Sequence, residues 1–202
     1  GGVAVVVLAV VLIFGLSFAQ DFPSLYDGGP TVEGTVAYIE FGPDDCLYVL
    51  DVASGEDREL YCDDWLGFEG WDADGYLQIL SGNGHHEELL ILDPNTGAVV
   101  RSDEFRPDER PPLDQPRTDA ERRLRASSRE GHVTLSYRQG DSEVTLIDVE
   151  GSRDYSFWDY GVTSDEKYAW ICDSEDRLLV VALDGTGGPW VVADDIGDPI
   201  WK

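Results

Sequence analysis

Two histidines and two glutamates stand side by side at residues 85–88, and these are the side chains best suited to bind a metal ion. Imidazole nitrogens and carboxylate oxygens are ligands that Zn²⁺ accepts in proteins. His85, His86, Glu87 and Glu88 follow one another directly, however, and adjacent residues of a strand point to opposite faces. A single ion would rarely reach both imidazoles. We therefore interpret the stretch as a solvated turn, with metal binding as the alternative.

Closely spaced aspartates give a second candidate, a calcium site. Asp72 and Asp74 lie in the sequence Trp-Asp-Ala-Asp-Gly, and this spacing resembles the start of a calcium-binding loop. The later ligands that such a loop places at fixed offsets do not follow. We favour aspartates that shape turns, expect no cofactor, and keep Ca²⁺ as the weaker alternative. Adjacent aspartate pairs of the same kind occur at Asp44-Asp45, Asp63-Asp64 and Asp194-Asp195.

No pattern of residues typical of an enzyme stands out. The sequence has no Gly-x-Ser-x-Gly motif, and none of its three histidines adjoins an obvious nucleophile. No glycine-rich phosphate loop leads from a strand into a helix. The 41 acidic residues make a carboxylate pair for glycoside chemistry available but not distinctive. We predict no catalytic residues and favour a non-catalytic protein.

Two of the three cysteines are predicted to form a disulfide. Cys46 opens the strand-like stretch Cys-Leu-Tyr-Val-Leu-Asp, and Cys62 closes the stretch Arg-Glu-Leu-Tyr-Cys. A hairpin that turns at residues 54–55 places the two cysteines nearly opposite each other, close enough for a bridge. The alternative is two separate buried thiols. Cys172 lies in an apolar strand and is expected to be buried as a small hydrophobic residue.

A basic island interrupts the acidic sequence at residues 101–130. Eight of the twelve arginines lie there together with four prolines, which predicts a long charged loop with a short helix at residues 119–125. We interpret the loop either as a docking segment, for an acidic partner or for the chain's own acidic surface, or as a solvated connection. The candidate docking residues are Arg117, Arg122, Arg123, Arg125 and Arg129.

These candidates lie within or between four similar hairpins. Each hairpin unit closes at an aspartate 17 or 18 residues after its first residue, and turn residues follow. Alternating apolar and polar residues predict half-buried strands, and the closing aspartate can accept a hydrogen bond from a backbone N–H two residues on. Copies recurring at this spacing predict the blades of a β-propeller, with a sandwich as the alternative. The units span residues 34–51, 75–93, 131–148 and 167–184.

The segments between the units carry a family resemblance. Residues 70–77, Gly-Trp-Asp-Ala-Asp-Gly-Tyr-Leu, resemble the turn motif of TolB-type, WD-like propeller repeats, in which an aromatic strand end leads into an Asp-Gly turn. Residues 161–170 match less closely because their turn lacks the glycine. The resemblance covers residues 34–201 and implies an all-β propeller, complete or partial, of about four blades. Residues 197–201 either begin a further blade or close the ring onto the first unit.

The first 19 residues carry no charge, which predicts export. Their apolar run is expected to form a helix, either in a cleavable signal peptide or in a retained membrane anchor, with a buried soluble helix as the third alternative. Residues 20–33 are interpreted as a linker and residues 34–202 as the repeats. The first two interpretations of the helix place the repeats outside the cytoplasm, in a periplasmic, extracellular or membrane-anchored protein.

The net charge of −27 argues against nucleic acid as a partner, because such binding needs a basic surface. We expect an exported, non-catalytic module that binds a protein partner or serves as a scaffold, with membrane contact only through an uncleaved N-terminal segment. Exposed aromatics such as Trp65, Trp158 and Trp190 would make contacts, with core packing as the alternative for each. Two other functions stay open: the propeller portion of a membrane-tethered, dipeptidyl-peptidase-like serine peptidase, and a glycan-binding propeller.

Overall fold

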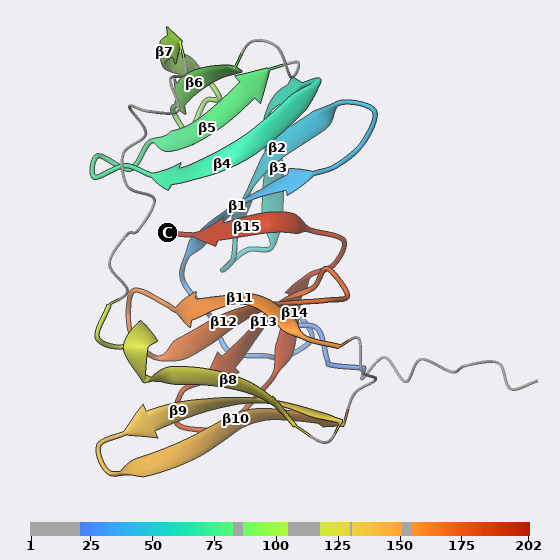
Figure 1. Ribbon diagram of the computed structural model, residues 1–202, viewed down its shortest axis with the longest axis vertical. Coiled ribbons are helices and arrows are strands. Elements are labelled where there is room, and N and C mark those ends of the chain that lie inside the picture. Colours follow the sequence, from blue (N-terminus) through green and yellow to red (C-terminus); the bar gives the residue numbers. More distant parts are fainter. Residues whose placement is uncertain (1–20, 83–86, 105–117, 130, 151–154) are drawn as a thin grey trace, which may run out of the picture.

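The computed structural model describes residues 21–82, 87–104, 118–129, 131–150 and 155–202 (Figure 1). Within these ranges the strands pair antiparallel in four separate sheets, so the all-β prediction is confirmed. The described ranges contain no helix that is long and apolar enough to cross a membrane. The predicted N-terminal helix lies outside the described residues.

We number the sheets by their first strand along the chain. The first sheet has the order β15-β1-β2-β3, the second β4-β5-β6-β7, the third β10-β9-β8 and the fourth β11-β12-β13-β14. A 3₁₀ turn, η2 (Glu121–Arg123), precedes β8. The strands are β1 (Thr35–Glu40), β2 (Asp45–Asp51), β3 (Glu56–Asp63), β4 (Trp65–Trp71), β5 (Leu77–Gly82), β6 (Glu87–Leu92), β7 (Val99–Glu104), β8 (Leu124–Arg129), β9 (His132–Gln139), β10 (Ser142–Glu150), β11 (Phe157–Val162), β12 (Tyr168–Asp173), β13 (Leu178–Ala182), β14 (Trp190–Ala193) and β15 (Gly197–Trp201).

Each predicted hairpin unit falls in a different sheet. The four units correspond to the hairpins β1–β2, β5–β6, β9–β10 and β12–β13. Strand β9 shows why the local sequence specifies a strand, because Val133, Leu135 and Tyr137 are buried while the residues between them are not. The third unit differs from the others at its end: Asp148 lies inside β10 instead of closing a turn.

The sheets stack face to face in the order second, first, fourth, third (Figure 1). A hairpin alone buries too little apolar surface to be stable, and stacking supplies the missing burial. Three separate cores fill the three junctions. Fully buried side chains include Leu77 and Ile79 between the second and first sheets, Val36 and Val180 between the first and fourth, and Leu135 and Ile171 between the fourth and third.

The stack is open. The second and third sheets lie at its opposite ends (Figure 1), and the described residues form no apolar core between those two sheets. Strand β15 pairs with β1, so residues 197–201 join the first unit, as one of the two alternatives predicted, but the predicted ring is not closed by this pairing. Four antiparallel sheets are therefore present without closure into a ring.

Residues 21–33 are packed against the sheets, which corrects the interpretation of residues 20–33 as a linker. Leu25 donates its backbone N–H to the carbonyl of Val191 at 2.7 Å, and Val191 donates to the carbonyl of Pro23 at 2.9 Å. This short segment runs parallel beside β14. Leu25 and Val32 are buried in the core between the first and fourth sheets, so the segment helps to join those two sheets.

The predicted charged loop of residues 101–130 is also corrected, because much of it is regular structure. Strand β7 continues to Glu104, and η2 with β8 occupies residues 121–129. The helix expected at residues 119–125 is therefore limited to a single 3₁₀ turn. The cause is pairing with β9: Leu124 is buried opposite Tyr137, and the residues that follow it extend along β9 as an edge strand.

Candidate functional site

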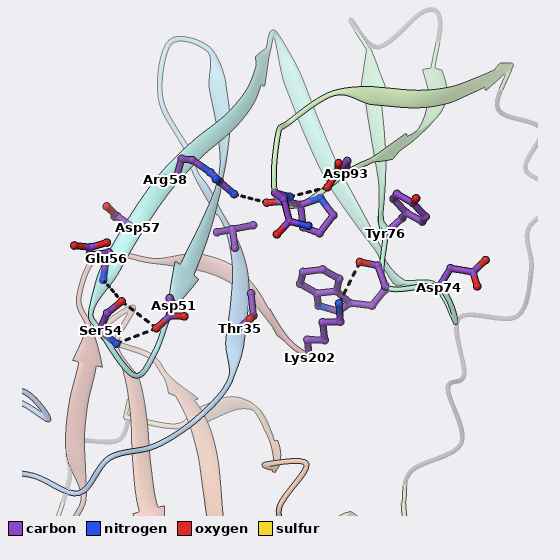
Figure 2. Close-up of a pocket in the computed structure, with 15 residues that line it drawn as sticks. Thr35, Asp51, Ser54, Glu56, Asp57, Arg58, Asp74, Tyr76, Asp93 and Lys202 are labelled. Carbon is purple, nitrogen blue, oxygen red and sulfur yellow. Dashed lines mark hydrogen bonds between the residues drawn. The ribbon is translucent and has the colours of Figure 1, made fainter.

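A groove of about 670 Å³ opens between the first and second sheets at the edge where their turns meet (Figure 2). Three turns supply most of its wall: β2–β3, β4–β5 and β6–β7. We call it the rim groove. It is lined by Thr35, Val49, Asp51, Ser54, Glu56, Asp57, Arg58, Trp71, Asp74, Gly75, Tyr76, Asp93, Pro94, Asn95 and Lys202.

Aspartates fix the shape of these turns. Asp51 accepts a hydrogen bond from the backbone N–H of Ser54 at 2.9 Å, and Asp93 accepts one from Asn95 at 2.8 Å. Asp72 accepts two, from the N–H groups of Asp74 and Tyr76, both at 2.9 Å. A short carboxylate that binds the backbone two to four residues on imitates a turn, which explains why aspartate precedes each one.

Hydrogen bonds of this kind favour the ionised form of Asp51 and Asp93. The Ser54 backbone N–H and hydroxyl lower the pKa of Asp51, and the Asn95 N–H lowers the pKa of Asp93. On the fourth sheet, the Thr186 hydroxyl and N–H lower the pKa of Asp184 in the same way. A general acid at neutral pH needs a raised carboxyl pKa, so these three groups are suited to charge and shape rather than to proton donation.

Cations and aromatic rings complete the groove. The guanidinium of Arg58 donates to the carbonyl of Pro94 and so links the first sheet to the β6–β7 turn (Figure 2). The ammonium of Lys202 lies 4.8 Å from the centre of the Trp71 ring and donates to the carbonyl of Gly75 at 3.2 Å. The groove therefore already holds two positively charged groups that belong to the chain itself.

Cys46 and Cys62 are joined by a disulfide between β2 and β3. The two residues are directly opposed across the strands, with Cα atoms 4.1 Å apart. Glu59 lies close to both sulfurs, but bonded sulfurs do not supply the thiolates that a metal site requires. Cys172 is not disulfide-bonded and is buried, as expected for a small residue in the core.

The other candidate metal ligands are partly accounted for by turns and sheet contacts. His85 and His86 lie outside the described residues, and Glu88 accepts a hydrogen bond from Ser102 at 2.8 Å. Asp45 is buried and accepts the backbone N–H of Leu66 at 3.1 Å. Asp63 accepts the hydroxyl of Ser81. Asp45 and Asp63 therefore connect the first sheet to the second.

The predicted docking arginines do not converge on the rim groove. Arg117 lies outside the described residues, and Arg122 forms an exposed ion pair with Asp119 at 3.4 Å. Arg125 and Arg129 are exposed on β8. Arg123 lines a second groove, of about 600 Å³, between the third and fourth sheets. The four described arginines lie on or beside the third sheet, at the far end of the stack from the rim groove.

The three tryptophans proposed as contact residues behave differently from one another. Trp65 is 40% exposed and Trp158 is 56% exposed. Trp190 is half-buried and packs against the core between the first and fourth sheets. None of them lines the rim groove; Trp71, which was singled out only as part of a turn motif, does.

A buried polar cluster in the fourth sheet was not expected from the sequence. Asp173 is fully buried and accepts hydrogen bonds from the Arg177 guanidinium at 2.7 Å and from the Tyr155 hydroxyl at 2.9 Å. Its other oxygen accepts the backbone N–H of Glu175 at 3.0 Å. The carboxylate of Asp173 and the guanidinium of Arg177 have opposite charges and lie in hydrogen-bonding contact, which offsets the desolvation cost of burying them. The signal was the Asp-x-x-x-Arg spacing across a turn.

Comparison with known proteins gives little. No protein-family model matches the chain, and no curated protein matches it. Among solved structures, the crystal structure of TolB from Acinetobacter baumannii is 13% identical, with a TM-score of 0.32. That alignment covers 85% of this chain, which spans 57% of the TolB chain. The resemblance to TolB-type repeats stays a prediction.

Proposed function

We propose that the chain is a propeller-like arc of four blades that acts as a non-catalytic, protein-binding module through the rim groove. The observation that carries the proposal is the make-up of this groove, in which three turns from two sheets meet around charged and aromatic side chains. Turn-lined edges held by rigid sheets are where binding residues concentrate in β proteins. The open stack also supports a binding function, because sheets that do not close into a ring leave their edges accessible to a partner.

Binding fits the charges in the groove better than catalysis does. Asp51 and Asp93 are already engaged as hydrogen-bond acceptors for backbone N–H groups, and their pKa values are lowered by those bonds. The Asp57 carboxylate accepts the hydroxyl of Tyr38 at 2.7 Å. Carboxylates held in this way give a fixed negative surface that can select a ligand of opposite charge.

We also propose that the module works outside the cytoplasm. The support is the disulfide between Cys46 and Cys62 together with the uncharged apolar sequence of residues 1–19. Disulfides persist in oxidising compartments and are rare in the cytosol. An alkaline phosphatase fusion after Lys202, expressed in a bacterial host, should be active if the repeats are exported and inactive if they are retained.

A random peptide library displayed on phage, selected against the purified full chain, tests the binding function. Selected peptides should bind wild-type protein and lose at least about tenfold in affinity for Asn95→Trp, which fills the groove from an exposed turn position. Ser142→Trp adds the same bulk at an exposed position of the third sheet and should leave affinity within about twofold.

Two results would contradict the proposal. One is a selection that enriches no peptide, or only peptides that bind Asn95→Trp as well as wild type. The other is turnover of a panel of peptide and glycoside substrates by the purified chain, since turnover would show catalysis and favour an enzyme, such as the peptidase alternative for peptide substrates.

A further inference from the structure

The lysine side chain in the rim groove occupies a site that has the features of an ammonium pocket. Nζ of Lys202 lies over the face of Trp71, where the ring quadrupole attracts a cation, and donates to the Gly75 carbonyl. The indole N–H of Trp71 also donates to the carbonyl of Ile200 at 3.4 Å. Trp71 is thus held by β15, and its ring is contacted by the positively charged group of Lys202.

Glycine at position 75 makes room for that charge. Gly75 has φ of +86°, which favours glycine, and a Cβ atom built there would lie 2.5 Å from Nζ of Lys202. The ammonium therefore sits where any other residue would place its side chain. The pocket is consequently shaped by backbone, with the ring of Trp71 on one side and the carbonyl of Gly75 as acceptor.

The Lys202 side chain can leave this site without breaking the pairing of β15 with β1. Lys202 is exposed, and its backbone N–H donates to the carbonyl of Thr35 at 2.9 Å independently of the side chain. Rotation of the Lys202 side chain into water would release its contacts with the Trp71 ring and the Gly75 carbonyl while β15 stays paired with β1. Exposed carboxylates of Glu56 and Asp74 border the same groove and favour a cationic ligand.

We propose that Trp71 and the Gly75 carbonyl form a subsite for a lysine ammonium of a partner protein, and that Lys202 is its internal competitor. The inference rests on the proposed binding function and adds the chemistry of the ligand, a lysine-bearing basic segment. Lys202 holds the pocket until such a segment replaces it, so removing the Lys202 side chain should raise affinity for the partner.

The probe is a fluorescently labelled decapeptide of alternating glycine and lysine, titrated by anisotropy against the full chain at physiological salt, where distant charges are screened. Lys202→Ala should bind it about tenfold more tightly than wild type, because one cation–aromatic contact and one hydrogen bond no longer compete. Lys167→Ala is the matched control: it removes the only other lysine, which pairs with Asp165 on the fourth sheet, and should change affinity by less than about twofold.

Two further variants separate the pocket from general attraction to an acidic protein. In the Lys202→Ala background, Trp71→Leu should weaken binding about tenfold, whereas Trp65→Leu, on the exposed outer face of the same sheet, should not. A peptide with acetylated lysines should bind Lys202→Ala no more tightly than it binds wild type. This control changes the peptide and needs no further change in the protein. The indole N–H signal of Trp71 in a ¹⁵N spectrum should shift only with the unmodified peptide.

Equal gains in Lys202→Ala and Lys167→Ala would show a net-charge effect and overturn the inference, as would binding that is insensitive to Trp71. If library peptides bind in an Asn95→Trp-sensitive way but show no preference for lysine, the binding function stands and the ammonium subsite falls. If neither the library nor the lysine peptide binds, both fall.

Discussion

The two ends of the stack are finished differently. On the third sheet, the face turned away from the fourth carries polar side chains that bond across strands, such as the hydroxyls of Ser127 and Thr134 at 2.8 Å and the pair His132–Asp148 at 3.0 Å. On the second sheet, the corresponding outer face carries Leu80 and Ile91, which are outside the core shared with the first sheet but only 4% and 9% exposed.

This difference shows that the two end sheets are not interchangeable copies. Period-two alternation sends one set of side chains inward and the other outward, and the inner sets of both sheets are apolar. Of the two end sheets, only the third has a polar outer face in addition to its apolar inner face. Trp65, which lies across Gly67 and beside Leu80, adds aromatic surface at the other end.

The largest expected effect is a loss of stability when a leucine is removed from the apolar inner face that both end sheets have. Leu135→Ala in the third sheet and Leu92→Ala in the second each remove a leucine with no exposed surface, and each should lower the free energy of unfolding by about 3.5 kcal/mol. Urea unfolding followed by tryptophan fluorescence measures the change. Thr134→Ala, on the outer face beside Leu135, is the control and should cost less than about 1 kcal/mol.

If the two leucine variants differed by more than about 2 kcal/mol, the inner faces would not be equivalent. The two end sheets would then differ in their inner faces as well as in their outer faces.

The second largest effect should come from removal of the disulfide, which should affect stability near the first sheet more than at the third sheet. It closes a loop of 16 residues in the first sheet, so the Cys46→Ser/Cys62→Ser variant should lose about 3 kcal/mol of stability. Hydrogen exchange should show faster opening of β2 and β3, with the third sheet, two junctions away, protected as in wild type. Cys172→Ser is the single-cysteine control. Equal loss of protection at both ends would mean that the stack unfolds as one unit.

The outer faces themselves should differ in how much stability a substitution by serine costs. Leu80→Ser removes a buried leucine and should destabilise by about 2 kcal/mol. Thr145→Ser on β10, where the outer face is already polar, should change stability by less than about 0.5 kcal/mol. Thermal unfolding of both variants is sufficient to compare them. A negligible effect of Leu80→Ser would indicate that the second sheet tolerates a polar outer face as the third sheet does.

The smallest effect concerns acid. The pKa of Asp93 is lowered below its ordinary 3.8 by hydrogen bonds, so the folded state binds fewer protons than the unfolded state does. This contribution to stability is present above pH 3.8 and is lost as the pH falls further. Asp93→Asn should flatten the dependence of the urea midpoint on pH between about 4 and 2.

A steeper acid dependence in Asp93→Asn would contradict the assigned direction of the Asp93 pKa shift. It would also remove one reason to regard the rim groove as a fixed negative surface.

Local rules explain what could be predicted. Alternation along a strand and the turn chemistry of aspartate and glycine involve neighbours in the chain, so the four hairpins and the roles of Asp51, Asp93 and Asp184 followed from spacing. Cys46 and Cys62 were placed opposite each other by the position of one turn. The same rules misled at residues 101–130, because β8 has one buried side chain, Leu124, and is a strand through its pairing with β9. They also misled at Asp148, which resembles a turn aspartate but lies within β10.

The sequence by itself determined strands, turns and the opposition of the two cysteines, because each depends on contacts a few residues to one hairpin apart. Only the tertiary structure decided the order of the sheets, the pairing of β15 with β1, the burial of Asp173 beside Arg177, and the meeting of Lys202 with Trp71. These last two residues are 131 positions apart in the chain. No local pattern relates them, since their contact exists only after the first and second sheets have packed together.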